Sequence, residues 1–171
     1  MTAAMSDVTA QLEDNSFYII LSLRGAQHGF HWSIFIPTNK KKGEMWHATN
    51  PSGGWFMETN TTEGLPYSKS LCLLLKLGTV TSENWQTLRS TLANVPSCGE
   101  PSLNTGEAFN CAVWVKDAIL ALHNAGVIHL AADIETIKSA AVDTAETNRE
   151  RVERGTGSFL VVNSTGFTTT A

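Results

Sequence analysis

Cys111 follows a residue that commonly caps helices, and this position bears on its reactivity. Asn110 precedes an apolar stripe at helical spacing, so the sequence predicts a helix that begins at Cys111 and runs to Ala125. The first turn of a helix carries unpaired N–H groups and the positive end of the dipole, which stabilise a thiolate and bind an oxyanion. Cys111 is therefore a candidate nucleophile. The alternative is a small buried apolar residue, which is what free cysteines most often are.

A thiol nucleophile needs a base that is itself held by a third group. The chain has five histidines. His123 and His129 lie about 18 Å or more from Cys111 along a straight predicted helix, which rises about 1.5 Å per residue, so we expect surface positions for both. His31 and His47 lie in two successive predicted strands, and adjacent strands are roughly 5 Å apart. This spacing favours contact between these two imidazoles, with His31 beside Cys111.

The role of His47 has two interpretations. It either orients and polarises His31 or is a strand residue whose polar atoms bind a neighbouring backbone group. In the second case Glu44, Asn50 or Glu58 becomes the candidate orienting residue. The choice depends on strand register, because a shift of one residue moves a side chain to the other face of the sheet.

The elements that position these residues are strands in the first half and helices in the second. Short apolar runs bounded by turn residues predict strands at residues 17–23, 31–36, 44–49, 55–59 and 71–77. Helical periodicity predicts helices over residues 82–92, 111–125 and 133–155. The expected fold is α+β, with an antiparallel sheet of about five strands followed by helices that pack on one face.

The length of 171 residues fits one domain. We expect residues 1–16 to form an N-terminal segment that can be flexible, residues 17–155 to form a single catalytic domain, and residues 156–171 to be a tail or an edge strand.

Composition excludes several classes of function. A net charge of −4 does not suit a nucleic-acid binder, and no apolar run is long enough for integral membrane association. Cys72, Cys98 and Cys111 form neither a zinc motif nor a disulfide framework, so we expect no cofactor and no metal. The first fifteen residues lack the features of a secretory signal, and we expect a reducing, cytoplasmic setting. The oligomeric state is left open.

Three motifs resemble those of lecithin:retinol acyltransferase-like proteins. They are Phe-His-Trp-Ser-Ile-Phe-Ile (residues 30–36), Glu-Met-Trp-His-Ala (44–48) and Phe-Asn-Cys-Ala-Val-Trp-Val (109–115). The order of histidine, second polar residue and cysteine is similar to that of the circularly permuted branch of the NlpC/P60 papain-like superfamily, which includes the PPPDE peptidases. The resemblance covers roughly residues 17–125. It implies a permuted papain-like fold in which Cys111 is the nucleophile, His31 the general base and His47 its orienting partner.

The expected function is a cysteine-dependent hydrolase or acyltransferase that acts on an amide, ester or thioester through a covalent acyl-enzyme. Its partner would be a small-molecule or peptide acyl substrate. The segment Pro37–Gly43 is longer than the resemblance implies, and no membrane-spanning segment follows the cysteine helix, which disfavours membrane-lipid acyl transfer. Two alternatives stay open. One is a non-catalytic binding module of the same fold, and the other is a metal-dependent enzyme that uses His28, His31 and His47 with Glu44.

Overall fold

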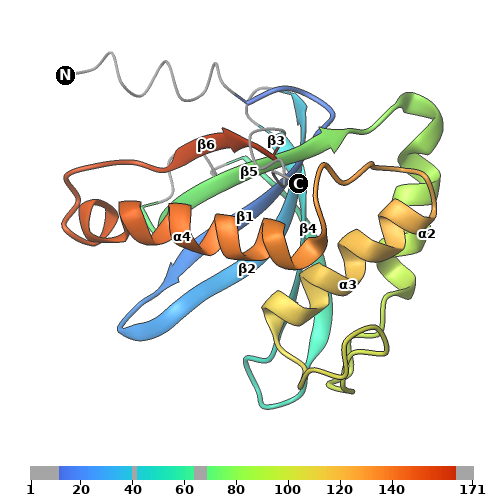
Figure 1. Cartoon of the computed structure of the whole chain (residues 1–171), viewed down its shortest axis with the longest axis horizontal. Coiled ribbons are helices and arrows are strands. Elements are labelled where there is room, and N and C mark those ends of the chain that lie inside the picture. The colour runs from blue at the N-terminus through green and yellow to red at the C-terminus, as the bar shows by residue number, and fades with distance from the viewer. Residues whose placement is uncertain (1–11, 40–41, 64–68, 165–171) are drawn as a thin grey trace.

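The computed structural model describes residues 12–39, 42–63 and 69–164. Six strands form one sheet in the order β4-β3-β2-β1-β5-β6 (Figure 1). Their bounds are β1 (Ser16–Arg24), β2 (Gln27–Asn39), β3 (Lys42–Thr49), β4 (Phe56–Thr62), β5 (Leu71–Thr79) and β6 (Leu160–Asn163). Within the described residues, the helical elements are a short 3-10 turn η2 (Ser82–Asn84) and the helices α2 (Trp85–Asn94), α3 (Cys111–Asn124) and α4 (Ile134–Glu153).

The α2, α3 and α4 helices cover one face of the sheet (Figure 1). Alternate strand residues such as Ile19 and Ile34 pack against helix residues such as Ala118 and Ala141, and all four are buried. Burial of such side chains contributes roughly 1.5–3 kcal/mol each for the larger ones. A smaller cluster that includes Tyr18, Ile20, Phe35, Leu71 and Leu74 lies on the other face. The expected α+β class, with helices on one face, is confirmed.

The sheet differs from the expected five-stranded antiparallel meander in two respects. β5 pairs with β1 rather than with β4, and β6 adds a sixth strand parallel to β5. The composition explains both. β5 is apolar at successive positions, as suits a strand covered on both faces, whereas β4 is rich in Thr, Asn and Glu and lies at the edge.

The ends of the chain fall partly outside the described residues. Residues 1–11 of the expected N-terminal segment and residues 165–171 of the expected tail lie there. Of the two alternatives for the tail, residues 160–163 form an edge strand. Within the described parts of the chain, no helix has the length and apolar character needed to cross a bilayer.

Candidate active site

Two histidines and a carboxylate form a continuous hydrogen-bonded row across β2, β3 and β4. His31 Nε2 lies 2.8 Å from His47 Nδ1, and His47 Nε2 lies 3.1 Å from Glu58 Oε2. The β3–β4 register places His47 directly opposite Glu58. The structure therefore brings His31 and His47 together, as expected, and adds Glu58, one of the alternative orienting residues, to the same row.

This row fixes which ring nitrogens carry protons when both imidazoles are neutral. A carboxylate only accepts hydrogen bonds, so Glu58 requires the proton of His47 on Nε2. His47 Nδ1 is then an acceptor, and it requires the proton of His31 on Nε2. The lone pair of His31 is consequently on Nδ1. A proton taken up at this nitrogen would leave the Nε2–H of His31 hydrogen-bonded to His47.

The environment of His31 keeps the ring neutral. Burial, then the positive potential of His47 and of Arg24, lower the pKa of His31 to about 4 from the usual 6.5. Burial acts in this direction because removal of water disfavours the charged imidazolium. His31 is therefore unprotonated, and available as an acceptor, throughout the physiological pH range.

The lowered pKa of His31 predicts a pH-dependent stability. In the unfolded chain His31 takes up a proton near pH 6.5, whereas in the folded chain it does so only near pH 4. The free energy of unfolding should therefore fall as the pH drops from 6.5 to 4, with this residue contributing at most about 1.4 kcal/mol per pH unit. Urea unfolding at pH 7.5, 5.5 and 4.5 measures it. His31→Asn should flatten the dependence, and His28→Asn, at an exposed position of the same strand, should not. Equal slopes in all three proteins would contradict the assignment.

Cys111 is the first residue of α3, and its surroundings match the predicted helix start. The Asn110 side chain accepts a hydrogen bond from the Val113 N–H at 2.9 Å, as an N-cap does. Cys111 is 8% exposed, and its thiol donates to the Phe30 carbonyl oxygen at 3.9 Å. Asn110 thus caps α3, and Cys111 lies at the positive end of the helix dipole.

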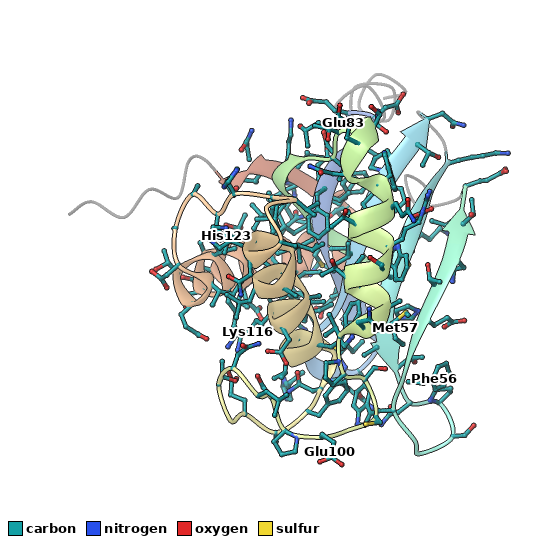
Figure 2. The ribbon with its side chains drawn as sticks, turned by 90° about the vertical axis from the view of Figure 1, so that its right-hand side faces the viewer. Phe56, Met57, Glu83, Glu100, Lys116 and His123 are labelled. Carbon is teal, nitrogen blue, oxygen red and sulfur yellow. The ribbon has the colours of Figure 1, made fainter. Side chains whose placement is uncertain are left out.

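The ring of His31 and the sulfur of Cys111 lie on opposite sides of β2. Phe30, Trp32 and Ile34 face the helices and belong to the same core cluster as Cys111. Strand residues alternate between faces, so His31 projects from the other face, with Phe35. Figure 2 shows the same alternation in β4, where Met57 points towards the helices. The expected contact between His31 and Cys111 is therefore wrong for this conformation, because the more apolar set of β2 residues occupies the helix-facing side.

His31 and Cys111 nevertheless lie at the same end of the β2–β3 ladder. At this unpaired end, residues 30–33 of β2 and residues 47–49 of β3 do not pair with each other. Within these described segments, β2–β3 pairing ends at Ile34 and Trp46. Leu23, the partner of Phe30 in β1, donates its N–H to Ser70, away from β2. In an antiparallel ladder, two opposite residues either both direct their N–H and C=O groups at each other or both direct them away. Because Leu23 directs its N–H away from β2, Phe30 directs its carbonyl away from β1 and towards β3. Cys111 occupies the helix side of this unpaired end, and the histidines occupy the other side.

Arg149 of α4 holds the adjacent hairpin in place. Its guanidinium donates to the Gly29 carbonyl at 2.7 Å and lies 4.4 Å from the centre of the Phe30 ring. Gly29 has a φ of 77°, a conformation that suits glycine. Arg149 thus fixes the residues that precede His31. No motif in the sequence marks Arg149, because the contact joins residues far apart in the chain.

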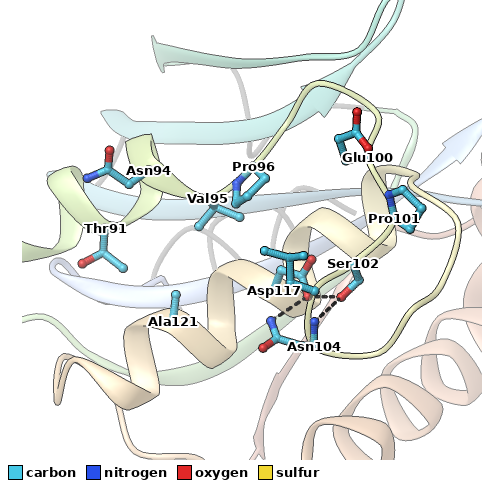
Figure 3. A pocket seen from close by; sticks show the side chains of 11 residues that line it. Thr91, Asn94, Val95, Pro96, Glu100, Pro101, Ser102, Asn104, Asp117 and Ala121 are labelled. Carbon is cyan, nitrogen blue, oxygen red and sulfur yellow. Dashed lines mark hydrogen bonds between the residues drawn. The ribbon is translucent and has the colours of Figure 1, made fainter.

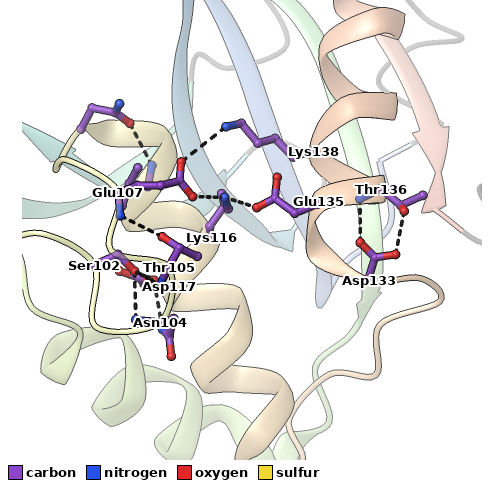
Figure 4. Close-up of polar contacts among 12 residues, drawn as sticks. Ser102, Asn104, Thr105, Glu107, Lys116, Asp117, Asp133, Glu135, Thr136 and Lys138 are labelled. Atoms are coloured by element: carbon purple, nitrogen blue, oxygen red, sulfur yellow. Dashed lines mark hydrogen bonds and ion pairs between the residues drawn. The ribbon is translucent and has the colours of Figure 1, made fainter.

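A buried polar network holds the loop that leads to Cys111. Ser102 donates to Asp117 Oδ1 at 2.7 Å and accepts from the Asn104 N–H at 3.1 Å (Figure 3). It also accepts from the Thr105 N–H at 3.1 Å. Lys116, which is 1% exposed, pairs with Glu107 and Glu135 (Figure 4). The hydrogen bond from Lys116 holds the pKa of the Glu107 carboxyl below its usual range. Burial acts to lower the pKa of Lys116, but the hydrogen bonds that Lys116 makes to Glu107 and Glu135 raise it overall. The loop therefore approaches Asn110 in a fixed path.

The remaining candidates lie apart from this region. Glu44 accepts from Arg89 at 2.9 and 2.7 Å, and His28 is exposed at the start of β2. Across residues 12–39, 42–63 and 69–164, no group of three or more histidine, cysteine or acidic residues is arranged to hold a metal ion. The alternative of a metal-dependent enzyme built on His28, His31 and His47 thus lacks a preformed ligand set.

The other two cysteines differ from Cys111 in accessibility. Cys72 is buried in the core, and burial raises the pKa of its thiol to about 11. Cys98 is exposed. Exposure alone would therefore make Cys98 a competing site of alkylation.

Residues 17–129 match the model of a family of unknown function, DUF6540. No curated protein and no solved structure matches the chain. The matched region contains His31, His47, Glu58 and Cys111, whereas Arg149 and the whole of α4 lie beyond it.

Proposed function

The chain belongs to the DUF6540 family, and on that premise we propose that it is a cysteine-dependent hydrolase or acyltransferase with a permuted papain-like fold. Cys111 is the nucleophile, His31 the general base, and His47 and Glu58 orient and polarise His31. The substrate carries an amide, ester or thioester carbonyl. The reduced thiol that this chemistry needs is compatible with a cytoplasmic setting.

One observation carries the proposal, namely the hydrogen-bonded row that leaves Nδ1 of His31 as an acceptor. A general base needs a free lone pair and a partner that holds its ring and tautomer. The row supplies the free lone pair on Nδ1, and His47 is the partner that fixes the ring. A further support is the position of Cys111 at the start of α3, where N–H groups and the helix dipole favour a thiolate and a developing oxyanion.

The reaction proceeds in two steps. His31 takes the thiol proton, the sulfur of Cys111 forms a bond to the carbonyl carbon, and the bond to the leaving group breaks as His31 returns the proton to it. Water or a second nucleophile then attacks the thioester and releases Cys111. Transfer of the first proton requires the unpaired end of the β2–β3 ladder to rearrange, so that the thiol leaves the Phe30 carbonyl and meets His31.

The experiment that tests this proposal is a structure of the protein after reaction of Cys111 with a haloacetyl thioester analogue, with Cys98 replaced by serine. The proposal expects an adduct on Cys111 with Nδ1 of His31 within hydrogen-bond distance of the sulfur or the leaving-group position. An adduct with His31 still on the opposite side of β2 would exclude His31 as the base.

A specific observation favours a second candidate, a non-catalytic binding module. The thiol of Cys111 is almost fully buried and donates to a backbone carbonyl, as a structural cysteine does. This candidate expects no acyl adduct on Cys111 from any activated ester or thioester, and it expects Cys111→Ala to leave ligand binding intact.

Variants of His47 separate an orienting role from a structural one. His47→Ala should lower turnover by about 10- to 100-fold, because His31 loses the partner that fixes its tautomer. His47→Gln should recover part of the loss, since the amide oxygen accepts the imidazole N–H. Turnover of an activated thioester, with circular dichroism to confirm folding, measures the effect.

The matched control is His129→Ala, which removes an exposed imidazole outside the row. It should leave turnover unchanged. If His47→Ala behaves like this control, His47 does not orient the base, and Glu58 would have no route to His31.

A further inference from the structure

A cavity of about 810 Å³ lies on the outer side of α3 (Figure 3). The C-terminal end of α2, the loop over residues 96–104 and α3 line it, and it is open to solvent on one side. Pockets of roughly 300–1,000 Å³ are typical of small-molecule sites. Asp117 and Ala121 line the cavity from α3, whereas Cys111 of the same helix packs in the core against the sheet. The cavity is therefore separate from the proposed active site.

The cavity has an acidic character. Its lining contains two carboxylates, Glu100 and Asp117, and no lysine, arginine or histidine among the described residues that form it. Asp117 is 9% exposed, and both of its protein donors, the Ser102 hydroxyl at 2.7 Å and the Asn104 side-chain amide at 3.0 Å, bind the same oxygen, Oδ1. In the contacts of the described residues, Oδ2 receives no donor. A nearly buried carboxylate thus retains an acceptor that a ligand could use, and a buried charge strongly favours an opposite charge beside it.

The remaining wall is largely apolar. Val95, Pro96, Pro101 and Ala121 supply aliphatic surface. Leu103 also lines the cavity, and it is 91% exposed, although leucine side chains of this size gain free energy when they are covered. A ligand with an apolar body would cover Leu103 while its polar end faced Asp117.

We propose that this cavity binds a small organic cation, in which a protonated amine is attached to an apolar body. The ammonium group donates to Oδ2 of Asp117, and the apolar body lies against Pro96, Pro101 and Leu103. The same lining disfavours anions, because Asp117 and Glu100 would repel a carboxylate or phosphate group. This site does not depend on Cys111 or His31.

Three probes with one apolar body test the proposal by isothermal titration calorimetry. They are 2-phenylethylamine, 2-phenylethanol and 3-phenylpropionate. The amine should bind at least about tenfold more tightly than the alcohol, and the carboxylate should show no heat of binding over the same range. Equal binding of the three, or no binding of the amine, would overturn the proposal.

Two variants locate the binding. Ala121→Leu places a larger apolar side chain on the wall of the cavity, one helical turn from Asp117, and should weaken amine binding. Asp117→Asn should weaken amine binding at least tenfold. Because Asp117 also holds the loop through Ser102, a second variant is made at an exposed carboxylate of the lining, and this Glu100→Gln change should weaken amine binding less. Cys111→Ala should retain full binding. Amine binding that Ala121→Leu leaves unchanged, or that Cys111→Ala removes, would show that the amine binds elsewhere.

Discussion

Cys111→Ala, made in a Cys98→Ser background, should reduce acyl transfer from an activated thioester by at least about 10³-fold. In the proposed mechanism the sulfur of Cys111 forms the covalent bond to the substrate, so no acyl-enzyme should accumulate in this variant. His31→Ala should cost about 10²- to 10⁴-fold, the usual contribution of a positioned general base. The double variant should be no slower than Cys111→Ala, because nucleophile and base act as a unit. Burst kinetics and intact-mass measurement of the acyl adduct give both quantities.

The Cys98→Ser background is needed because Cys98 is exposed and would react by itself. Cys72 serves as an internal control, since burial raises the pKa of its thiol to about 11 and leaves little thiolate at neutral pH. An acyl group found on Cys72, or an undiminished burst after Cys111→Ala, would rule out Cys111 as the nucleophile.

Trp114→Ala should lower the free energy of unfolding by about 3–5 kcal/mol, the usual cost of removing a large buried aromatic side chain. Trp114 belongs to α3 and is fully buried in the core. Its indole Nε1 has no hydrogen-bond partner among the described residues, although an unpaired buried donor costs about 1–3 kcal/mol. Trp114→Phe removes that donor and keeps most of the ring volume. It should therefore cost much less than Trp114→Ala.

Urea unfolding followed by circular dichroism measures the free energy of unfolding of both variants. If its slope with urea concentration is the same in both variants and in the original protein, their unfolded states are comparable. If Trp114→Phe is as destabilising as Trp114→Ala, the indole N–H makes a contact in solution that stabilises the fold. Trp85→Phe, at a partly exposed position of α2, is the control for a general effect of removing an indole.

The strands and helices were readable from the sequence because turn residues bound each of them. The predicted helix start at Cys111 matches α3, since the Asn110 cap is a local feature. The position of β5 beside β1 was not predicted, because pairing between distant segments leaves no local signal. Its apolar character at successive positions was nevertheless a sign of a strand covered on both faces.

The same contrast between local signals and contacts of distant segments applies to the candidate site, which the sequence predicts in part. The contact between His31 and His47 follows from their positions in adjacent strands. The side of β2 from which His31 projects depends on which set of alternating residues meets the helices. Phe30, Trp32 and Ile34 are the more apolar set, so the sequence did contain the signal that His31 faces away. The roles of Asp117, Lys116 and Arg149 could not be predicted, because each depends on a partner that the tertiary fold supplies.

The parallel pairing of β6 with β5 sets the order in which the protein can be completed during synthesis. Leu73 pairs with Leu160, and α2, α3 and α4 lie between them in the chain. The β1–β2 and β2–β3 hairpins join near neighbours and can form early, whereas closure of this long loop carries a larger entropic cost. A ribosome-bound chain therefore exposes the β5 edge, an apolar strand with unpaired backbone groups, until residue 163 has emerged. During that interval the nascent chain is most vulnerable to pairing with another chain and has the greatest need of a chaperone.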